Sequence, residues 1–403
     1  MNTFTGMATA ETHSHPIRIF LIFLKLGLTS FGGPIAHLEY FRQEFVFRRK
    51  WLNAHAYVDL VSLCQFLPGP ASSQVGIALG LSRGGIPGAI AAFLGFTLPS
   101  VIFLILCGFG LSAVGGNAWM LAGIHGLKIV AVAIVAQALW SMGRLLGRDT
   151  LRIAIALGAA IISVLFSTAW SQIILIVAGG LVGIFLLKSA KGIPHVPIPA
   201  AVSRMGGVAS LALFFLLLIG LPLVATSQTY AVKLFDAFYR AGALVFGGGH
   251  VVLPLLQSQV VPPGWVSSGV FMTGYGLAQA VPGPLFTFAA YLGAVSTQSP
   301  RGWGGAAIAV GAIFLPAFLL IVGIFPFWEQ LRKHSLMQRA MLGINAVVVG
   351  LLLAALYNPV WTSGIKSIVD LALAAFALLL LMVGQWPSWA VVIITVTIAV
   401  IVG

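Results

Sequence analysis

Residues 65–70 read QFLPGP, and residues 279–284 read QAVPGP. A second shared stretch precedes each of them at nearly the same distance, KLGLTSFGGP at 25–34 and RAGALVFGGG at 240–249. The chain is therefore a duplication. In an apolar chain, Gly and Pro interruptions at matching places in two halves indicate a transporter site, because broken helices free backbone groups to meet an ion inside the bilayer.

The composition sets the environment of the fold. Of the 403 residues 60% are hydrophobic and 7% are charged, and the mean hydropathy is +1.06. A water-soluble domain of this size could not cover its surface with so few charges. We therefore predict an all-α polytopic integral membrane protein, since a lipid-exposed backbone must satisfy its own hydrogen bonds. The apolar runs suffice for roughly 10 to 13 transmembrane helices, some broken by Gly and Pro near the bilayer midplane.

Hydropathy and the duplication divide the chain into four predicted segments. These are a polar N-terminal tail (1–15), a first repeat (16–190), a linker with an extra transmembrane helix (191–230) and a second repeat (231–403). The two repeats have equivalent loops of different charge: four Lys or Arg lie in 37–55 and none in 250–267. The positive-inside rule then places these loops on opposite sides of the membrane and predicts inverted repeats. Counting each Pro-Gly-Pro segment as a returning pair of helices would instead leave the halves parallel.

The net charge is +13, with 21 Lys and Arg against 8 Asp and Glu. In a soluble protein this excess would suggest nucleic acid, but here the cations gather in short connections, where they set topology and contact anionic lipids. The chain has no dinucleotide fingerprint, spaced cysteine pair or paired axial histidines, and His125 has no evident partner for hydrolytic chemistry. We therefore predict neither an enzyme nor a cofactor or metal site, and no nucleic-acid partner.

These residues resemble the chromate ion transporter family. The similar stretches are KLG at 25–27, FGGPIAHL at 31–38, QFLPGP at 65–70, FGGGH at 246–250 and PGP at 282–284. The resemblance covers nearly the whole chain and fits the long form of the family, with two fused homologous halves. It implies a secondary transporter that exports chromate across the bacterial inner membrane and confers chromate resistance. Sulfate or another oxyanion is the alternative substrate, a non-transporting scaffold is the alternative of another class, and a homodimer is left open.

The breaks offer donors for a tetrahedral anion. Pro68-Gly69-Pro70 separates two apolar stretches, and a helix that starts after it presents unpaired amides and a positive dipole end. The second half is less polar after its break, so we expect the first half to hold the substrate and the second to serve as scaffold and gate. The predicted substrate-binding residues of the two motifs are Gly32, Gly33, Gln65, Gly69, Ser72, Ser73 and Gln74, with Gly247, Gly248, Gln279 and Gly283 in the second half. The alternative is that the breaks only let helices pack closely.

Charged and titratable residues complete the predicted site. Lys25 and Arg240 lie six residues before the two Phe-Gly-Gly stretches, and as a pair they could compensate a dianion. Snorkelling to the interface is the alternative for Lys25. We predict that His37, Glu39 and Asp59 could couple transport to protons. The alternative for His37 is a histidine that lies at the membrane interface and carries no proton.

Overall fold

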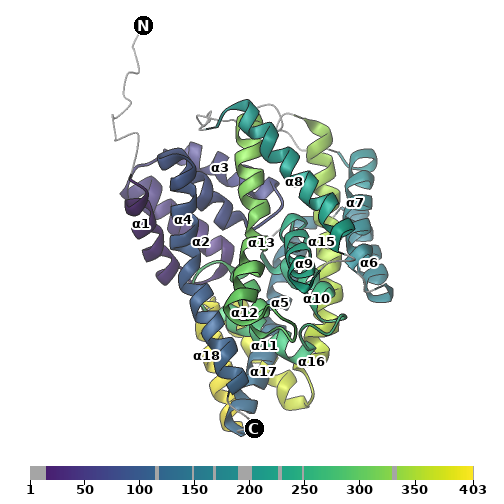
Figure 1. Ribbon diagram of the computed structural model, residues 1–403. Coiled ribbons are helices and arrows are strands. Elements are labelled where there is room, and N and C mark those ends of the chain that lie inside the picture. The colour runs from purple at the N-terminus through teal and green to yellow at the C-terminus, as the bar shows by residue number, and fades with distance from the viewer. Residues whose placement is uncertain are drawn as a thin grey trace.

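The computed structural model describes residues 15–113, 118–147, 149–166, 169–188, 202–225, 229–246, 249–328 and 334–402. Every regular element in these ranges is helical, as predicted (Figure 1). The first half contains α1 (Pro16–Thr29), α2 (Gly33–Arg42), η1 (Gln43–Arg48), α3 (Ala54–Phe66), α4 (Ala71–Ala113), α5 (Ala118–Leu146), α6 (Thr150–Leu165) and α7 (Ala169–Leu186). The predicted polar tail lies outside the described residues except for His15, which caps α1.

The linker contributes α8 (Arg204–Ala225), which is the predicted extra helix. The second half contains α9 (Tyr230–Ala243), η2 (Gly249–Val251), α10 (Val252–Val260), α11 (Ser268–Ala280), η3 (Leu285–Thr287), α12 (Phe288–Val295), α13 (Gly302–Ile324), η4 (Phe325–Phe327), α15 (Ser335–Ala355), η5 (Leu356–Trp361), α16 (Thr362–Gly364), α17 (Ile368–Met382) and α18 (Ser388–Val402). Five of the described segments are long and apolar enough to cross a bilayer: 71–110, 121–144, 204–225, 302–327 and 335–364. Shorter helices such as the 14-residue α1 reach only about 21 Å and must end within the membrane.

The long helix α4 is two antiparallel helices joined by a sharp turn. Gly84 and Gly85 are non-helical, and the φ of Gly85 is +62°. A Cβ added to Gly80 would lie 2.3 Å from the carbonyl oxygen of Gly88. The second half repeats this hairpin with α12 and α13, where a Cβ on Gly293 would lie 2.3 Å from the carbonyl oxygen of Gly305. Glycine is required at these contacts because the two backbones touch.

Each Pro-Gly-Pro segment enters the molecule and returns to the side from which it came. The guanidinium of Arg83, which follows the first part of α4, donates to the carbonyl oxygen of Trp51, just before α3, at 2.9 Å. In the second half the backbone N–H of Thr297, after α12, donates to the carbonyl oxygen of Trp265, before α11, at 3.0 Å. Both segments are therefore returning pairs of short helices.

The two halves are inverted with respect to each other. The helix α1 begins beside Ile86, whereas α9 begins beside Ser296, which Tyr230 contacts at 2.5 Å. The second part of α4 and α13 run antiparallel, since Phe93 packs on Phe314 and Phe109 packs on Trp303. The start of α1, beside Ile86, and the start of α9, beside Ser296, therefore lie at opposite ends of the molecule. The expectation that returning pairs leave the halves parallel is wrong, because α8 crosses the molecule between them.

The halves also interlock. The helix α5 packs against α17 and α18 of the second half, and α15 packs against α6 and α7 of the first. Equivalent glycines make both contacts: a Cβ on Gly126 would lie 2.8 Å from Ala399, and one on Gly343 would lie 2.0 Å from the carbonyl oxygen of Gly179. Each half therefore completes the packing of the other.

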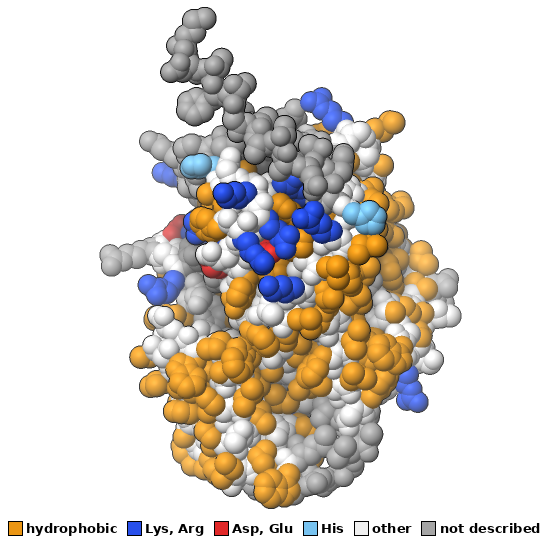
Figure 2. Space-filling model, turned by 90° about the vertical axis from the view of Figure 1, so that its left-hand side faces the viewer, with side chains coloured by type: hydrophobic (Ala, Val, Ile, Leu, Met, Phe, Trp, Pro, Cys, Tyr) orange, Lys and Arg blue, Asp and Glu red, His pale blue; other side chains and the backbone are white. Residues whose placement is uncertain are grey.

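Cations gather at the end of the molecule where α1 begins, which we call the basic end (Figure 2). The helix ends and connections there carry Arg18, Arg42, Arg48, Arg49, Lys50, Arg83, Arg144, Arg152, Lys188, Arg204 and Arg339. Among them Glu44 bonds Arg49 and Arg48. Burial acts to raise the pKa of Glu44, but these hydrogen bonds outweigh it and hold the pKa below its usual value. Glu44 thus stays ionised and fixes two arginines of this loop.

Candidate functional site

The two Pro-Gly-Pro breaks dock on helix ends of the opposite half. The backbone N–H of Gly69 donates to the carbonyl oxygen of Val245 at 2.7 Å, and that of Gly283 donates to the carbonyl oxygen of Ser30 at 2.9 Å. Ser30 and Val245 are equivalent residues, each directly before a Phe-Gly-Gly stretch. Each Pro-Gly-Pro break therefore contacts the helix end before the Phe-Gly-Gly stretch of the opposite half, and the two contacts are equivalent.

Only glycine fits the centre of each break. Gly69 has a φ of +123° and Gly283 a φ of +101°, where an L side chain is strained. A Cβ would also lie 2.8 Å from the Gln74 amide nitrogen at Gly69, and 2.9 Å from the Ser100 hydroxyl at Gly283. The breaks are thus tightly fitted to the polar side chains beside them.

The first turn of α4 begins directly after the first break and is lined with buried polar groups. The exposed fractions are 3% for Ser72, 3% for Ser73 and 0% for Gln74. The Gln74 amide nitrogen donates to the carbonyl oxygen of Pro68 at 2.7 Å, which holds the side chain across the break. Within the described residues, Ser73 Oγ and Gln74 Oε1 have no hydrogen-bond partner. Buried polar atoms without partners are costly, so a ligand or water that bonds them has a physical reason to be there.

His37 connects this turn to the helix end of its own half. Its Nε2 lies 3.2 Å from the carbonyl oxygen of Ser30, and its Nδ1 lies 3.4 Å from Ser72 Oγ. A carbonyl oxygen only accepts, so Nε2 carries the proton and Nδ1 accepts from the Ser72 hydroxyl in the neutral form. The ring packs edge-on against Phe96. Of the three residues assigned to proton coupling, His37 is the one that touches the break.

The second half presents a different set of polar contacts. His250 Nδ1 lies 2.9 Å from the Tyr275 hydroxyl. Within the described residues the Gln279 amide nitrogen has no partner. Thr287 closes the turn after the second break by donating to the carbonyl oxygen of Pro284 at 2.7 Å. Sequence reasoning missed Tyr275, because its partner His250 lies 25 residues earlier in the chain.

Several predicted residues lie elsewhere. Gln65, in the last turn of α3, has an exposed side chain, unlike its half-buried equivalent Gln279. Glu39 is exposed and accepts a hydrogen bond from Gln43 at 2.7 Å, so it belongs to the surface of α2. Asp59 is buried within α3. The structure therefore does not gather the three proposed proton carriers in one place.

The glycines of the two Phe-Gly-Gly stretches have different surroundings. Gly32 and Gly33 lie at the start of α2 with φ of +100° and +75°. Gly249, the third glycine of the second stretch, meets the first half, since a Cβ there would lie 3.2 Å from Pro34. Gly247 and Gly248 lie outside the described residues. The two Phe-Gly-Gly stretches therefore lie close to each other, at the places where each was predicted to end a helix.

Lys25 and Arg240 have equivalent positions but unlike surroundings. Lys25 is exposed, on the face of α1 that also exposes Leu21 and Leu28. Arg240 is bound by Asp236, with Nε 2.9 Å from Oδ1, and both side chains are largely buried. The predicted joint role of the two cations in binding a dianion stays a prediction, and the carboxylate already offsets the charge of Arg240.

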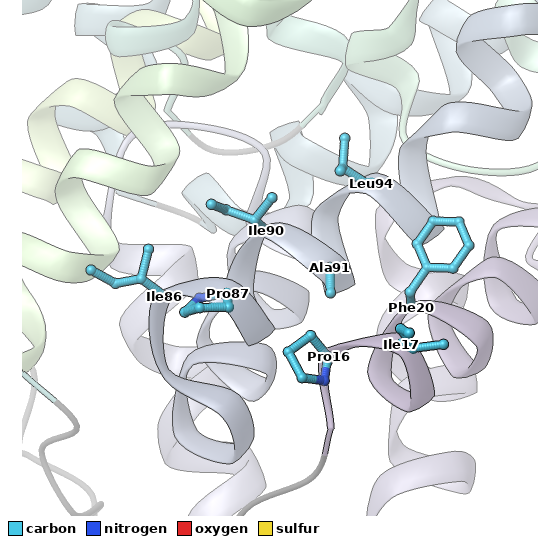
Figure 3. Close-up of a pocket in the computed structure, with 8 residues that line it drawn as sticks. All are labelled: Pro16, Ile17, Phe20, Ile86, Pro87, Ile90, Ala91 and Leu94. Atoms are coloured by element: carbon cyan, nitrogen blue, oxygen red, sulfur yellow. The ribbon is translucent and has the colours of Figure 1, made fainter.

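A surface groove lies away from this centre. It has a volume of about 410 Å³ and lies between α1 and the second part of α4 near the basic end (Figure 3). Its lining is apolar: Pro16, Ile17, Phe20, Ile86, Pro87, Ile90, Ala91 and Leu94. It offers an oxyanion no donor side chain, and its chemistry suits an acyl chain.

Comparison with known proteins gives the family. The family model described as "Chromate transporter" matches residues 17–184 and 232–402. The chromate transport protein of Pseudomonas aeruginosa is 29% identical over 351 residues, which are 86% of this chain and 82% of that protein. A probable chromate transport protein of Synechococcus elongatus is 28% identical over 392 residues, covering 93% of this chain and 92% of its own.

A shorter relative matches one half alone. The uncharacterized transporter YwrA of Bacillus subtilis is 31% identical over 140 residues, which are 34% of this chain and 76% of YwrA. No solved structure matches the chain at a significant level. The family model covers both halves, and the chain therefore belongs to the chromate transporter family.

Proposed function

We propose that the protein is a secondary transporter that exports chromate across the bacterial inner membrane and thereby confers chromate resistance. The observation that carries the proposal is the first turn of α4 beside the broken helix, where two buried polar atoms, Ser73 Oγ and Gln74 Oε1, have no partner among the residues that the structure describes. Membership of the family supports chromate as the substrate. Sulfate has the same charge and shape, so it is the alternative that the experiment must separate.

The turn suits a tetrahedral dianion for two reasons. The helix start leaves its first backbone amides without intrahelical acceptors, and the dipole favours negative charge there. The hydroxyls of Ser72 and Ser73 can rotate to donate, and the Gln74 amide can exchange its bond with Pro68 for one with the anion. No carboxylate is needed for this binding, and the described turn contributes none.

The charge distribution supports the direction of transport. By the positive-inside rule the basic end faces the cytoplasm. A dianion that leaves an inside-negative cell then gains about 4.6 kcal/mol per 100 mV, twice the value for one charge. Export can therefore be driven by the membrane potential.

Vesicle uptake tests the proposal. Everted vesicles that contain the protein should accumulate labelled chromate when a potential is imposed. Ser73→Ala should raise the KM for chromate about tenfold, the usual loss when a hydrogen bond to a charged group is removed. The same variant should be slightly more thermally stable, because it deletes a buried hydroxyl that has no partner in the described residues.

The control is Ser82→Ala on the same helix, whose exposed hydroxyl bonds the carbonyl oxygen of Leu79; its KM should match that of the wild type. Robust sulfate flux without chromate flux would favour the alternative substrate. No flux of either anion, in protein that is folded and inserted, would favour a scaffold.

His37 predicts a pH dependence. When the ring takes a second proton, Nδ1 becomes a donor to Ser72, whose own hydrogen is then free to bond the anion, and a positive charge is added beside the site. Because the ring is buried, its charged form is disfavoured, so chromate binding should strengthen only at acidic pH, well below the range in which a free histidine titrates. His37→Gln keeps a donor and an acceptor but cannot titrate, so its KM should be independent of pH. A variant with the wild-type profile would rule out proton coupling through His37.

A further inference from the structure

The end of the molecule opposite the basic end contains a second group of cations that the proposed site does not use. Lys128 lies in the first half of α5 and is half-buried. Its ammonium reaches along α11 to the first turn of that helix, so that a Cβ on Gly269 would lie 3.3 Å from Lys128 Nζ. This places a positive charge at a helix start on the side of the molecule opposite the basic end.

Three further groups surround this ammonium. The hydroxyls of Ser268, in α11, and Ser363, in α16, lie 3.1 Å apart. A Cβ on Gly364 would lie 2.7 Å from the backbone oxygen of Lys128, so α16 touches α5 at this residue. Lys366 follows two residues later, is exposed and donates its ammonium to the carbonyl oxygen of Thr362 in α16, and its positive charge acts on Lys128. Two lysines and two hydroxyls therefore lie on three neighbouring segments: α5, the start of α11, and residues 363–366.

The nearby carboxylate is engaged elsewhere. Asp370 Oδ1 lies 2.8 Å from His125 Nε2, and Oδ2 accepts from the backbone N–H groups of Lys366 and Ser367 at 2.8 and 2.9 Å. This is the partner of His125 that the sequence did not reveal. Within the described residues Lys128 has no hydrogen-bond acceptor and no ion pair. A half-buried cation next to another cation, without a counter-ion, favours an anion from outside.

The duplication shows that this charge is not required by the fold. The residue of α15 equivalent to Lys128 is Asn345, since both follow the glycine that packs α5 or α15 on the other half. The corresponding place near the basic end therefore has a neutral side chain. The lysine is present in one half only.

We propose that Lys128, Lys366, Ser268 and Ser363 form an anion-binding site at the outer mouth, which takes the tetrahedral dianion after it leaves the break. The inference rests on the proposed function. The helix α11 connects the two places, because it begins at this site and ends at the second break, where Gln279 lies.

Transport measured separately from the two faces tests the site. Right-side-out vesicles loaded with unlabelled chromate exchange it for labelled chromate outside, which must enter through the outer mouth. Lys128→Gln should raise the half-saturating chromate concentration about tenfold in this assay. In everted vesicles, where chromate enters at the basic end, the value should not change. Lys128→Arg should restore most of the affinity.

The control is Lys233→Gln, which removes an exposed lysine of α9 and should match the wild type on both faces. If Lys128→Gln leaves the outer half-saturating concentration unchanged, or raises it equally on both faces, the site is overturned, while wild-type chromate transport and the proposed function stay intact. Absence of chromate exchange by the wild type would overturn both.

Discussion

Replacing Gly69 by alanine should strongly weaken chromate uptake at low chromate concentration in protein that still inserts. The added Cβ meets the Gln74 amide at 2.8 Å in a backbone with φ of +123°, so it strains the break and displaces a predicted substrate ligand. We expect a stability loss of about 1–3 kcal/mol. The KM for chromate should rise at least about tenfold, the loss of one charge-assisted hydrogen bond. Thermal unfolding and vesicle uptake measure the two effects.

Gly283→Ala gives the matched comparison in the second half. Its strain is similar, but its Cβ meets Ser100 rather than a proposed ligand, so the maximal rate should fall while KM changes little. Gly158→Ala is the neutral control, because a Cβ there meets nothing within 4 Å. Equal KM values in the Gly69 and Gly283 variants would contradict the assignment of substrate binding to the first half.

Replacing Arg240 by glutamine should strongly destabilise the protein. The change leaves Asp236, which is 4% exposed, as a buried charge without its partner. Breaking a buried pair in this way costs about 3–5 kcal/mol. The double variant Asp236→Asn with Arg240→Gln removes both charges and should recover most of this loss. Thermal unfolding of the single and double variants measures the coupling.

Flux through the double variant then decides the role of Arg240. If Arg240 binds the anion, as its position in the repeat suggests, the double variant is stable but its KM for chromate is raised. An unchanged KM would show that Arg240 serves only to hold Asp236. Lys233→Gln on the same helix is the control, since that exposed lysine can be removed without opening a buried pair.

Much of the fold was available from the sequence. The composition required helices, and Pro-Gly-Pro required them to break, because proline cannot donate and glycine permits positive φ. Loop charge predicted inverted halves. The expectation that returning pairs make the halves parallel was wrong. The relative orientation of the halves depends on α8, which crosses the molecule once between them and lies outside both repeats.

The candidate site was predicted only in part. The helix start after the first break was predicted because a helix start is a local property of the chain, and substrate binding by its residues stays a prediction. Glu39 and Gln65 were included by proximity in sequence, and the structure places both side chains at the surface, because the side of a helix that faces inward is set by its neighbours. Tyr275 and the His125–Asp370 pair were missed because their partners come from distant segments.

The sequence by itself determined where the helices end and which groups their ends expose, since both follow from local backbone chemistry. Only the tertiary structure decided what those ends meet. The bonds from Gly69 to Val245 and from Gly283 to Ser30 join residues that are far apart in the chain. They exist because two inverted halves pack against each other, and that packing is fixed by the sum of many contacts rather than by any one motif.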